Sequence, residues 1–195
     1  MQRSAVITGS PGRVGDVAIA LKEAGFDVTE AGCGERLNEV AGGLEAGSVH
    51  TYVQLPWDVE AAAPGAVGQV HQFLSGGLLA RFRMANTMLP LLRPGASVVL
   101  VAGNRPADTP TPDDRHARKS LLRVLARTIE SDTAKAGVRT VVVGEHCSPV
   151  EIAELALHGG PENGRSRLDY AAHGEDLSYD DWVREVLVLS TPWWD

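Results

Sequence analysis

The chain has 195 residues, 44% of them hydrophobic and 22% charged, with a net charge of −7 and a pI of about 5.4. This composition is typical of one globular domain, and it argues against a general nucleic-acid-binding surface, which is usually basic. No apolar run approaches the length of a membrane span, and no secretory leader precedes the first strand pattern. We therefore expect a cytoplasmic protein, a single domain over residues 1–195, that binds neither nucleic acid nor membrane.

The first strand–turn–helix pattern carries the strongest functional signal. A strand is expected at 4–8 and a helix at 13–24, with Gly9, Gly12 and Gly15 at a spacing of three between and within them. Such a turn lets the backbone approach a phosphate, while the helix start offers free N–H groups and partial positive charge. We expect Gly9 to make the tight turn, Gly12 to clear the approach path, and Gly15 to let helix and strand pack closely. The alternative is a glycine turn that binds nothing.

Strand and helix patterns alternate along the rest of the chain, which predicts a parallel sheet covered on both faces. Further strands are expected at 26–31, 49–55, 97–102, 138–143 and 167–171. Helices are expected at 35–44, 66–92, 114–136, 149–157 and 179–189, and a proline-rich loop at 103–114. The prediction is a three-layer α/β/α Rossmann-like fold, a doubly wound parallel sheet in one domain.

The two cysteines and the aromatic tail have a weaker interpretation. Cys33 and Cys147 lie far apart, with neither metal-ligand nor redox-motif spacing, so we expect reduced thiols and no metal site. The Trp193-Trp194 pair has a large apolar area that needs burial, in its own domain or on a partner subunit. We expect the region of about 146–195 to be variable and to supply substrate or oligomer contacts.

Four segments together resemble the short-chain dehydrogenase/reductase superfamily over roughly residues 4–145. They are the Thr8-Gly9 glycine motif, the helix end Met88-Leu89-Pro90-Leu91-Leu92-Arg93-Pro94-Gly95, the strand at 97–102, and the helix–turn–strand from Lys119 to Val143. The glycine spacing is closer to that of the extended members of the superfamily. The resemblance implies that NADP or NAD is held by Thr8, Gly9, Ser10, Gly12, Arg13, Val14 and Gly15. It also implies a homo-oligomer, a dimer or tetramer, formed through the helices at 66–92 and 114–136.

The catalytic residues of that superfamily are mostly missing, as in a divergent, truncated member. Arg115 stands where the family has its tyrosine, while Lys119 matches the lysine four residues later. The family serine position reads Ala102-Gly103-Asn104, the helix asparagine falls near Gly77, and the Asn-Asn-Ala-Gly segment falls at 53–56 without matching. One βα unit before residue 49 is shortened or missing.

Some chemistry remains open to the two basic residues. Arg115 stays protonated and cannot act as the family's proton donor, but it can polarise a carbonyl or bind a carboxylate or phosphate. Lys119 lies one helical turn further on the same face, where the resemblance implies contact with the nicotinamide ribose. The alternative is a solvated basic helix face. His116 and the trio Glu145-His146-Cys147 are weaker candidates, an exposed helix start and a structural loop.

Two functions follow, and the cofactor type stays open between them. One is an oxidoreductase that moves a hydride to or from a small carbonyl or alcohol substrate through an atypical site. The other is a non-catalytic dinucleotide- or partner-binding protein, a sensor or structural subunit. A third, a non-redox enzyme such as a lyase or isomerase with His116, His146 or Glu145 as acid–base residues, has no positive feature in the sequence. Glu30 and Glu35 would favour NAD at the second strand, whereas Arg13 and Arg36 would favour the 2′-phosphate of NADP.

Overall fold

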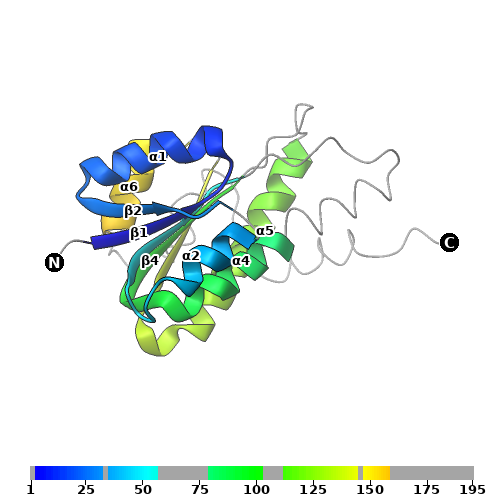
Figure 1. Ribbon diagram of the computed structural model, residues 1–195. Coiled ribbons are helices and arrows are strands. Elements are labelled where there is room, and N and C mark those ends of the chain that lie inside the picture. Colours follow the sequence, from blue (N-terminus) through cyan, green and yellow to red (C-terminus); the bar gives the residue numbers. More distant parts are fainter. Residues whose placement is uncertain (1–2, 33–34, 57–78, 103–111, 145–146, 159–195) are drawn as a thin grey trace.

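The protein folds around one parallel sheet (Figure 1). The computed structural model describes residues 3–32, 35–56, 79–102, 112–144 and 147–158, with only the backbone path at 35 and 112–121. The five strands lie in the order β2-β1-β3-β4-β5, and every neighbouring pair is parallel. Their bounds are β1 Arg3–Thr8, β2 Phe26–Glu30, β3 Val49–Gln54, β4 Leu92–Val101 and β5 Arg139–Val143.

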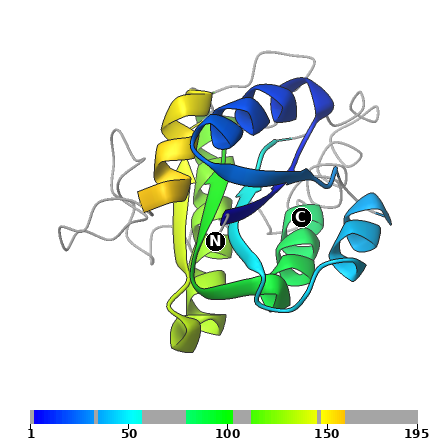
Figure 2. The same cartoon turned by 60° about the vertical axis from the view of Figure 1, so that its left-hand side comes forward.

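Helices cover both faces of the sheet, as predicted. One face carries α1 (Pro11–Glu23) and α6 (Pro149–His158), which lie side by side (Figure 2). The other face carries α2 (Glu35–Gly42), α4 (Ala80–Met88) and α5 (Pro112–Asp132). Short 3₁₀ turns at Leu89–Leu91 and Ala134–Ala136 follow α4 and α5. This is the predicted doubly wound, single-domain Rossmann-like arrangement.

Alternation along the buried strands produces two apolar cores. Ile7 and Val53 face α1 and α6, whereas Val6, Tyr52 and Val98 face the opposite layer of helices. All of these side chains are almost fully buried, and each aliphatic one contributes about 1.5–3 kcal/mol through burial. Because both faces of the sheet are covered, the strands read as nearly continuous apolar runs.

The element boundaries differ from the sequence prediction at proline positions. Helix α1 begins at Pro11, two residues early, because a proline fits the first helical position, where no N–H is needed. The predicted loop up to 114 gives way to α5 at Pro112 for the same reason. Helix α4 ends at Met88, before Pro90, rather than at 92.

Strand β4 begins five residues earlier than predicted. Leu92 already pairs with Val49, and the register then shifts before Thr51 pairs with Ser97. Gly95 lies inside this irregular stretch with a φ of +75°, a conformation that glycine adopts without strain. The apolar pattern of 97–102 alone could not indicate this extension, because Arg93, Pro94 and Gly95 are exposed.

Several predicted segments lie outside the described residues. They are the first part of the helix at 66–92, most of the loop at 103–114, and everything after 158, with the strand at 167–171, the helix at 179–189 and the tryptophan pair. None of the described helices combines the length and apolar character that a membrane crossing requires.

Candidate dinucleotide site

The candidate site lies at the carboxyl edge of the sheet, where β1 and β3 end side by side. From β1 the chain turns back through α1 to β2 on one side, whereas β3 lies on the other side of β1. The order of strands therefore reverses between β1 and β3. In open α/β sheets, ligands bind in the crevice that such a reversal leaves outside the strand ends.

Gly9 is required by the close approach of the chain after β3. A Cβ built at Gly9 would lie 2.6 Å from Cβ of Leu55, and the φ of Gly9 is +153°. Two backbone hydrogen bonds hold these two segments together: Leu55 N–H donates to the Thr8 carbonyl at 2.8 Å, and Ser10 N–H donates to the Pro56 carbonyl at 3.2 Å. Gly9 therefore lies between β1 and α1 against Leu55, where a larger residue does not fit unless the backbone moves.

The start of α1 offers fewer bare amides than predicted. Ser10 N–H is used by Pro56, Pro11 has no N–H, and the Arg13 and Val14 amides donate to the Ser10 carbonyl at 3.0 and 3.1 Å. Among the described residues, only the amide of Gly12 in this first turn has no acceptor. A Cβ at Gly12 would meet no described atom within 4 Å. The start of a helix carries partial positive charge, which favours an anion there.

The packing role predicted for Gly15 is wrong. A Cβ at Gly15 would meet no described atom within 4 Å. Helix α1 packs through a different row of residues, Val14, Val17, Ala18 and Leu21, and Gly15 lies beside that row. Among the described residues, this glycine leaves unfilled space on the surface of α1 and makes no close contact with a strand.

Thr8, at the end of β1, and Val14, in the first turn of α1, are both buried. Thr8 is fully buried, and its hydroxyl lies 3.0 Å from the Tyr52 hydroxyl. Val14 is buried in the core beneath α1. Their side chains are therefore packed inside the protein, and a ligand would meet their backbone instead. Ser10 is also buried, whereas Arg13 is exposed beside the start of the helix.

A buried polar network lies beneath this edge of the sheet. Gln54 Nε2 donates to the Tyr52 hydroxyl at 3.0 Å and to the Arg81 carbonyl at 3.1 Å. The Arg81 guanidinium, only 4% exposed, donates to the Val101 carbonyl at 2.9 Å. The network thus joins β1, β3, β4 and α4. Sequence reasoning missed it, although a Tyr and a Gln two positions apart in a buried strand share one face and so need partners.

Tyr52 lies too deep in the core to act as a proton donor. Burial raises the pKa of Tyr52 to about 12, even though its hydrogen bonds to Thr8 and Gln54 act in the opposite direction. The Tyr52 residue is only 1% exposed, so its hydroxyl is enclosed by protein. A proton donor needs contact with the substrate, which this position excludes.

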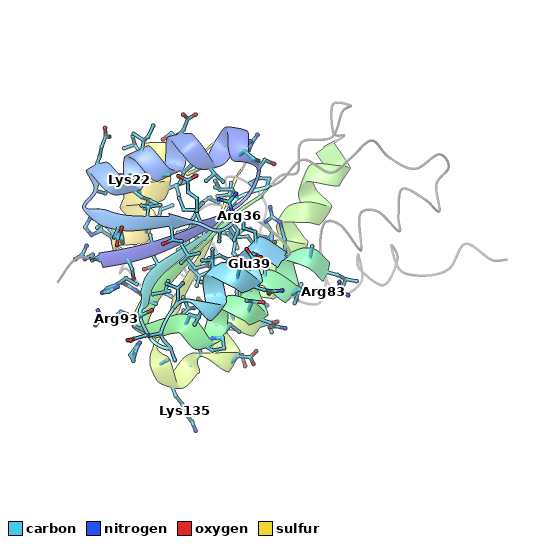
Figure 3. The ribbon with its side chains drawn as sticks, in the orientation of Figure 1. Lys22, Arg36, Glu39, Arg83, Arg93 and Lys135 are labelled. Carbon is cyan, nitrogen blue, oxygen red and sulfur yellow. The ribbon has the colours of Figure 1, made fainter. Side chains whose placement is uncertain are left out.

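Beyond β2, a basic side chain covers a glycine. The Ala31 N–H still donates to the Ile7 carbonyl, at 2.9 Å, and Gly32 then turns the chain with a φ of +61°. Cδ of Arg36, on the first turn of α2, lies 3.3 Å from the position of a Cβ on Gly32. Figure 3 shows Arg36 near this strand end, at the same end of the molecule as the start of α1. Glu30 is exposed at the end of β2, directly before Ala31.

The predicted catalytic pair lies on α5. Arg115 and Lys119 are one turn apart in the first half of this helix, which begins on the side of the molecule towards which the strands run (Figure 1). Their side chains, and that of His116, are outside the described residues. Gly103, Asn104 and the position near Gly77 also lie outside them.

Cys147 is a poor nucleophile. Burial, with the Glu151 carboxylate second, raises the pKa of the Cys147 thiol to about 11. Glu151 instead closes the start of α6, where its carboxylate accepts from the Ser148 amide at 2.8 Å and from the Ser148 hydroxyl at 2.7 Å. The structural interpretation of this loop is therefore favoured; Glu145 and His146 lie outside the described residues. No cluster of three potential metal ligands forms in the described part of the chain.

Neither a family model nor a curated protein sequence matches this chain. Solved structures do share its fold. A protein described as a short-chain dehydrogenase/reductase, from Corynebacterium glutamicum, has a TM-score of 0.51 at 19% identity, covering 78% of this chain and 88% of its own. A short chain dehydrogenase family protein from Francisella tularensis has a TM-score of 0.52 at 11% identity, covering 74% of this chain and 69% of its own. BdcA from E. coli has a TM-score of 0.52 at 17% identity, covering 82% of this chain and 90% of its own. At these identities the similarity is one of fold.

Proposed function

We propose that this chain binds a nicotinamide dinucleotide at the crevice between the ends of β1 and β3. The observation that carries the proposal is the start of α1, where the Gly12 N–H has no acceptor and an added Cβ would meet no atom among the described residues. This combination lies at the strand-order reversal, where a diphosphate is favoured by both the amide and the helix dipole. The similarity in fold to short-chain dehydrogenase/reductase proteins supports the same ligand class.

The described residues fit a dinucleotide with an extra phosphate. Arg13 and Arg36 are exposed, and neither forms an ion pair with a described residue. Arg36 lies over Gly32, just past the end of β2, where the adenosine ribose of a bound dinucleotide is expected. We infer that Arg36, with Arg13, holds a 2′-phosphate and so favours NADP(H) over NAD(H). Glu30, earlier on β2, is the residue that would favour the opposite preference.

The proposed reaction is hydride transfer to or from a small carbonyl or alcohol. The bound nicotinamide would supply the hydride chemistry. Lys119 would contact the ribose, and Arg115, one turn earlier on α5, would orient and polarise the substrate oxygen. Arg115 donates hydrogen bonds but does not release a proton, so water or another residue would complete the proton transfer.

A non-catalytic dinucleotide-binding protein is the second candidate. Two observations favour it: Tyr52 is sealed in the core, and the Cys147 thiol has a raised pKa, so neither supplies an acid or a nucleophile. Such a protein would bind the cofactor without turnover, as a sensor or a structural subunit. Turnover of bound cofactor separates the two candidates.

The test is a calorimetric titration with NAD, NADH, NADP and NADPH. We expect NADPH to bind most tightly, and Gly12→Ala to weaken it about tenfold or more, because a methyl group enters the diphosphate path. Gly42→Ala is the matched control, since Gly42 is also a helical glycine with nothing within 4 Å of its added Cβ. Absence of binding with all four nucleotides would overturn the proposal.

Cofactor preference is tested by a pair of arginine variants. Arg36→Gln should weaken NADPH about tenfold or more and leave NADH unchanged, because one charge-assisted contact is lost. Arg83→Gln is the control, an exposed arginine on α4 away from this strand end (Figure 3). Equal losses for both dinucleotides in Arg36→Gln would refute the assignment of the 2′-phosphate.

Redox activity is tested separately, by the absorbance of the reduced nicotinamide with a panel of small aldehydes and ketones. Oxidoreductase activity predicts turnover that Lys119→Met and Arg115→Met each reduce. Cofactor binding without turnover on any member of the panel would favour the non-catalytic candidate.

A further inference from the structure

A second cluster of polar and basic residues lies at the opposite, amino-terminal edge of the sheet. We call it the amino-edge cluster: Arg3 and Ser4 at the start of β1, Ser48 just before β3, His50 on β3, and Arg93 at the start of β4. Arg93 Nη1 lies 2.6 Å from His50 Nε2, and Ser4 Oγ lies 3.1 Å from His50 Nδ1. Figure 3 shows Arg93 at the end of the molecule away from Arg36. This cluster therefore does not belong to the dinucleotide crevice.

Both ring nitrogens of His50 face groups that donate hydrogen bonds. A guanidinium only donates, and Arg93 Nη1 lies beside Nε2. The Ser4 amide donates to Nδ1 at 3.2 Å, and the Ser4 hydroxyl, which donates to the Ser48 carbonyl at 2.6 Å, lies beside the same nitrogen. A neutral imidazole has only one acceptor nitrogen, so the cluster has more N–H and O–H groups than acceptors.

The positive charge of the cluster also has no carboxylate partner in the described part of the chain. Arg3 and Arg93 are exposed, and neither forms an ion pair with a described residue. Among the described carboxylates on adjoining elements, neither Asp27 on β2 nor Glu45 before β3 forms an ion pair with either guanidinium. Burial, Arg93 and Arg3 together lower the pKa of His50. Ser48 Oγ is shielded from water and has no hydrogen-bond partner in the described part of the chain.

We propose that the amino-edge cluster binds the phosphate group of a small molecule. A phosphate supplies the missing acceptors: Arg93 can turn its forked donors onto the anion, and Arg3 balances its second charge. His50 is then released from Arg93, and its ring can take up a second proton from solvent and become a further donor. A dianion suits a cluster of two fixed cations and one imidazole better than a carboxylate, which offers a single charge and two oxygens.

The test follows the imidazole of His50 directly, by NMR titration with inorganic phosphate and with glycerol phosphate. His50→Gln identifies its signal among those of the six histidines. Chloride at matched ionic strength controls for screening. We expect either phosphate ligand to shift the signal saturably and to raise the pKa of His50, because binding favours the protonated ring. A preference for the monoester indicates an organic phosphate as the ligand, and a preference for inorganic phosphate indicates the free anion.

Variants separate this site from the crevice. Arg93→Gln should weaken phosphate binding about tenfold or more, because a charge-assisted contact is lost. Arg139→Gln is the matched control on the same edge, since Arg139 already donates to the His158 carbonyl at 2.9 Å and reaches Ser97 Oγ at 3.4 Å. Arg13→Gln tests the crevice.

Two results would overturn the proposal. One is a His50 shift no larger with phosphate than with chloride. The other is binding that Arg93→Gln leaves intact and Arg13→Gln abolishes, which would place the phosphate at the start of α1. Because the readout is His50 itself, the outcome is independent of whether the crevice binds a dinucleotide. Arg93→Gln alters an exposed side chain, so it tests the site even if His50→Gln does not fold.

Discussion

Replacing Gly9 with alanine should destabilise the fold more than any other glycine substitution in the α1 loop. The added Cβ would lie 2.6 Å from Leu55 Cβ, whereas two carbons pack best at about 3.5–4.0 Å. Separating them means moving the ends of β1 and β3 apart by about 1 Å, against the two backbone hydrogen bonds that join them. Overpacking of this kind costs about 1–3 kcal/mol.

The backbone conformation adds to this cost. The φ of Gly9 is +153°, and holding an L-residue in this glycine region costs about 1–3 kcal/mol more. A loss of about 2–6 kcal/mol is large beside the 5–15 kcal/mol that stabilises a typical domain. For a chain of this size, it corresponds to a fall in Tm of about 4–24 °C.

The assay is urea unfolding followed by circular dichroism, with Gly12→Ala as the matched control. An added Cβ at Gly12 would meet no described atom within 4 Å, and alanine suits a helix better than glycine, so this variant should be as stable as the wild type or slightly more so. A Gly9→Ala protein within about 0.5 kcal/mol of the wild type would refute the reasoning, since surface changes have effects of that size. A double-mutant cycle with Leu55→Gly, which removes the opposing Cβ, should recover part of the loss.

Three further predictions concern the titratable groups. Tyr52→Phe should lower the free energy of unfolding by about 1–3 kcal/mol, because Gln54 loses a buried partner; an unchanged value would show that water replaces the hydroxyl. Cys147 should react with iodoacetamide more slowly at pH 8 than it does in the unfolded chain, and Glu151→Gln should speed it, as peptide mass mapping can measure. In phosphate-free buffer, the contribution of His50 to the free energy of unfolding should be fully present above pH 6.5 and be lost as the pH falls below that value, because its folded-state pKa is lowered. His50→Gln should flatten this part of the profile of stability against pH. An unaltered profile would contradict the lowered pKa.

The pattern of residues along the chain determined the order and type of the elements. Strand β1, the glycine turn and α1 follow from local signals, and the alternation of strands and helices leaves few ways to build the sheet other than a parallel one covered on both faces. The position of the candidate site followed too, because a glycine turn after the first strand of such a sheet must lie at its carboxyl edge.

Only the tertiary structure decided which residues meet. Leu55 approaches Gly9, and Pro56 takes the Ser10 amide, only because β3 lies directly beside β1. The same strand order brings His50 to Arg93, 43 positions away in the chain. Such contacts depend on register and strand order, which arise when the whole sheet assembles, so local periodicity carries no signal for them.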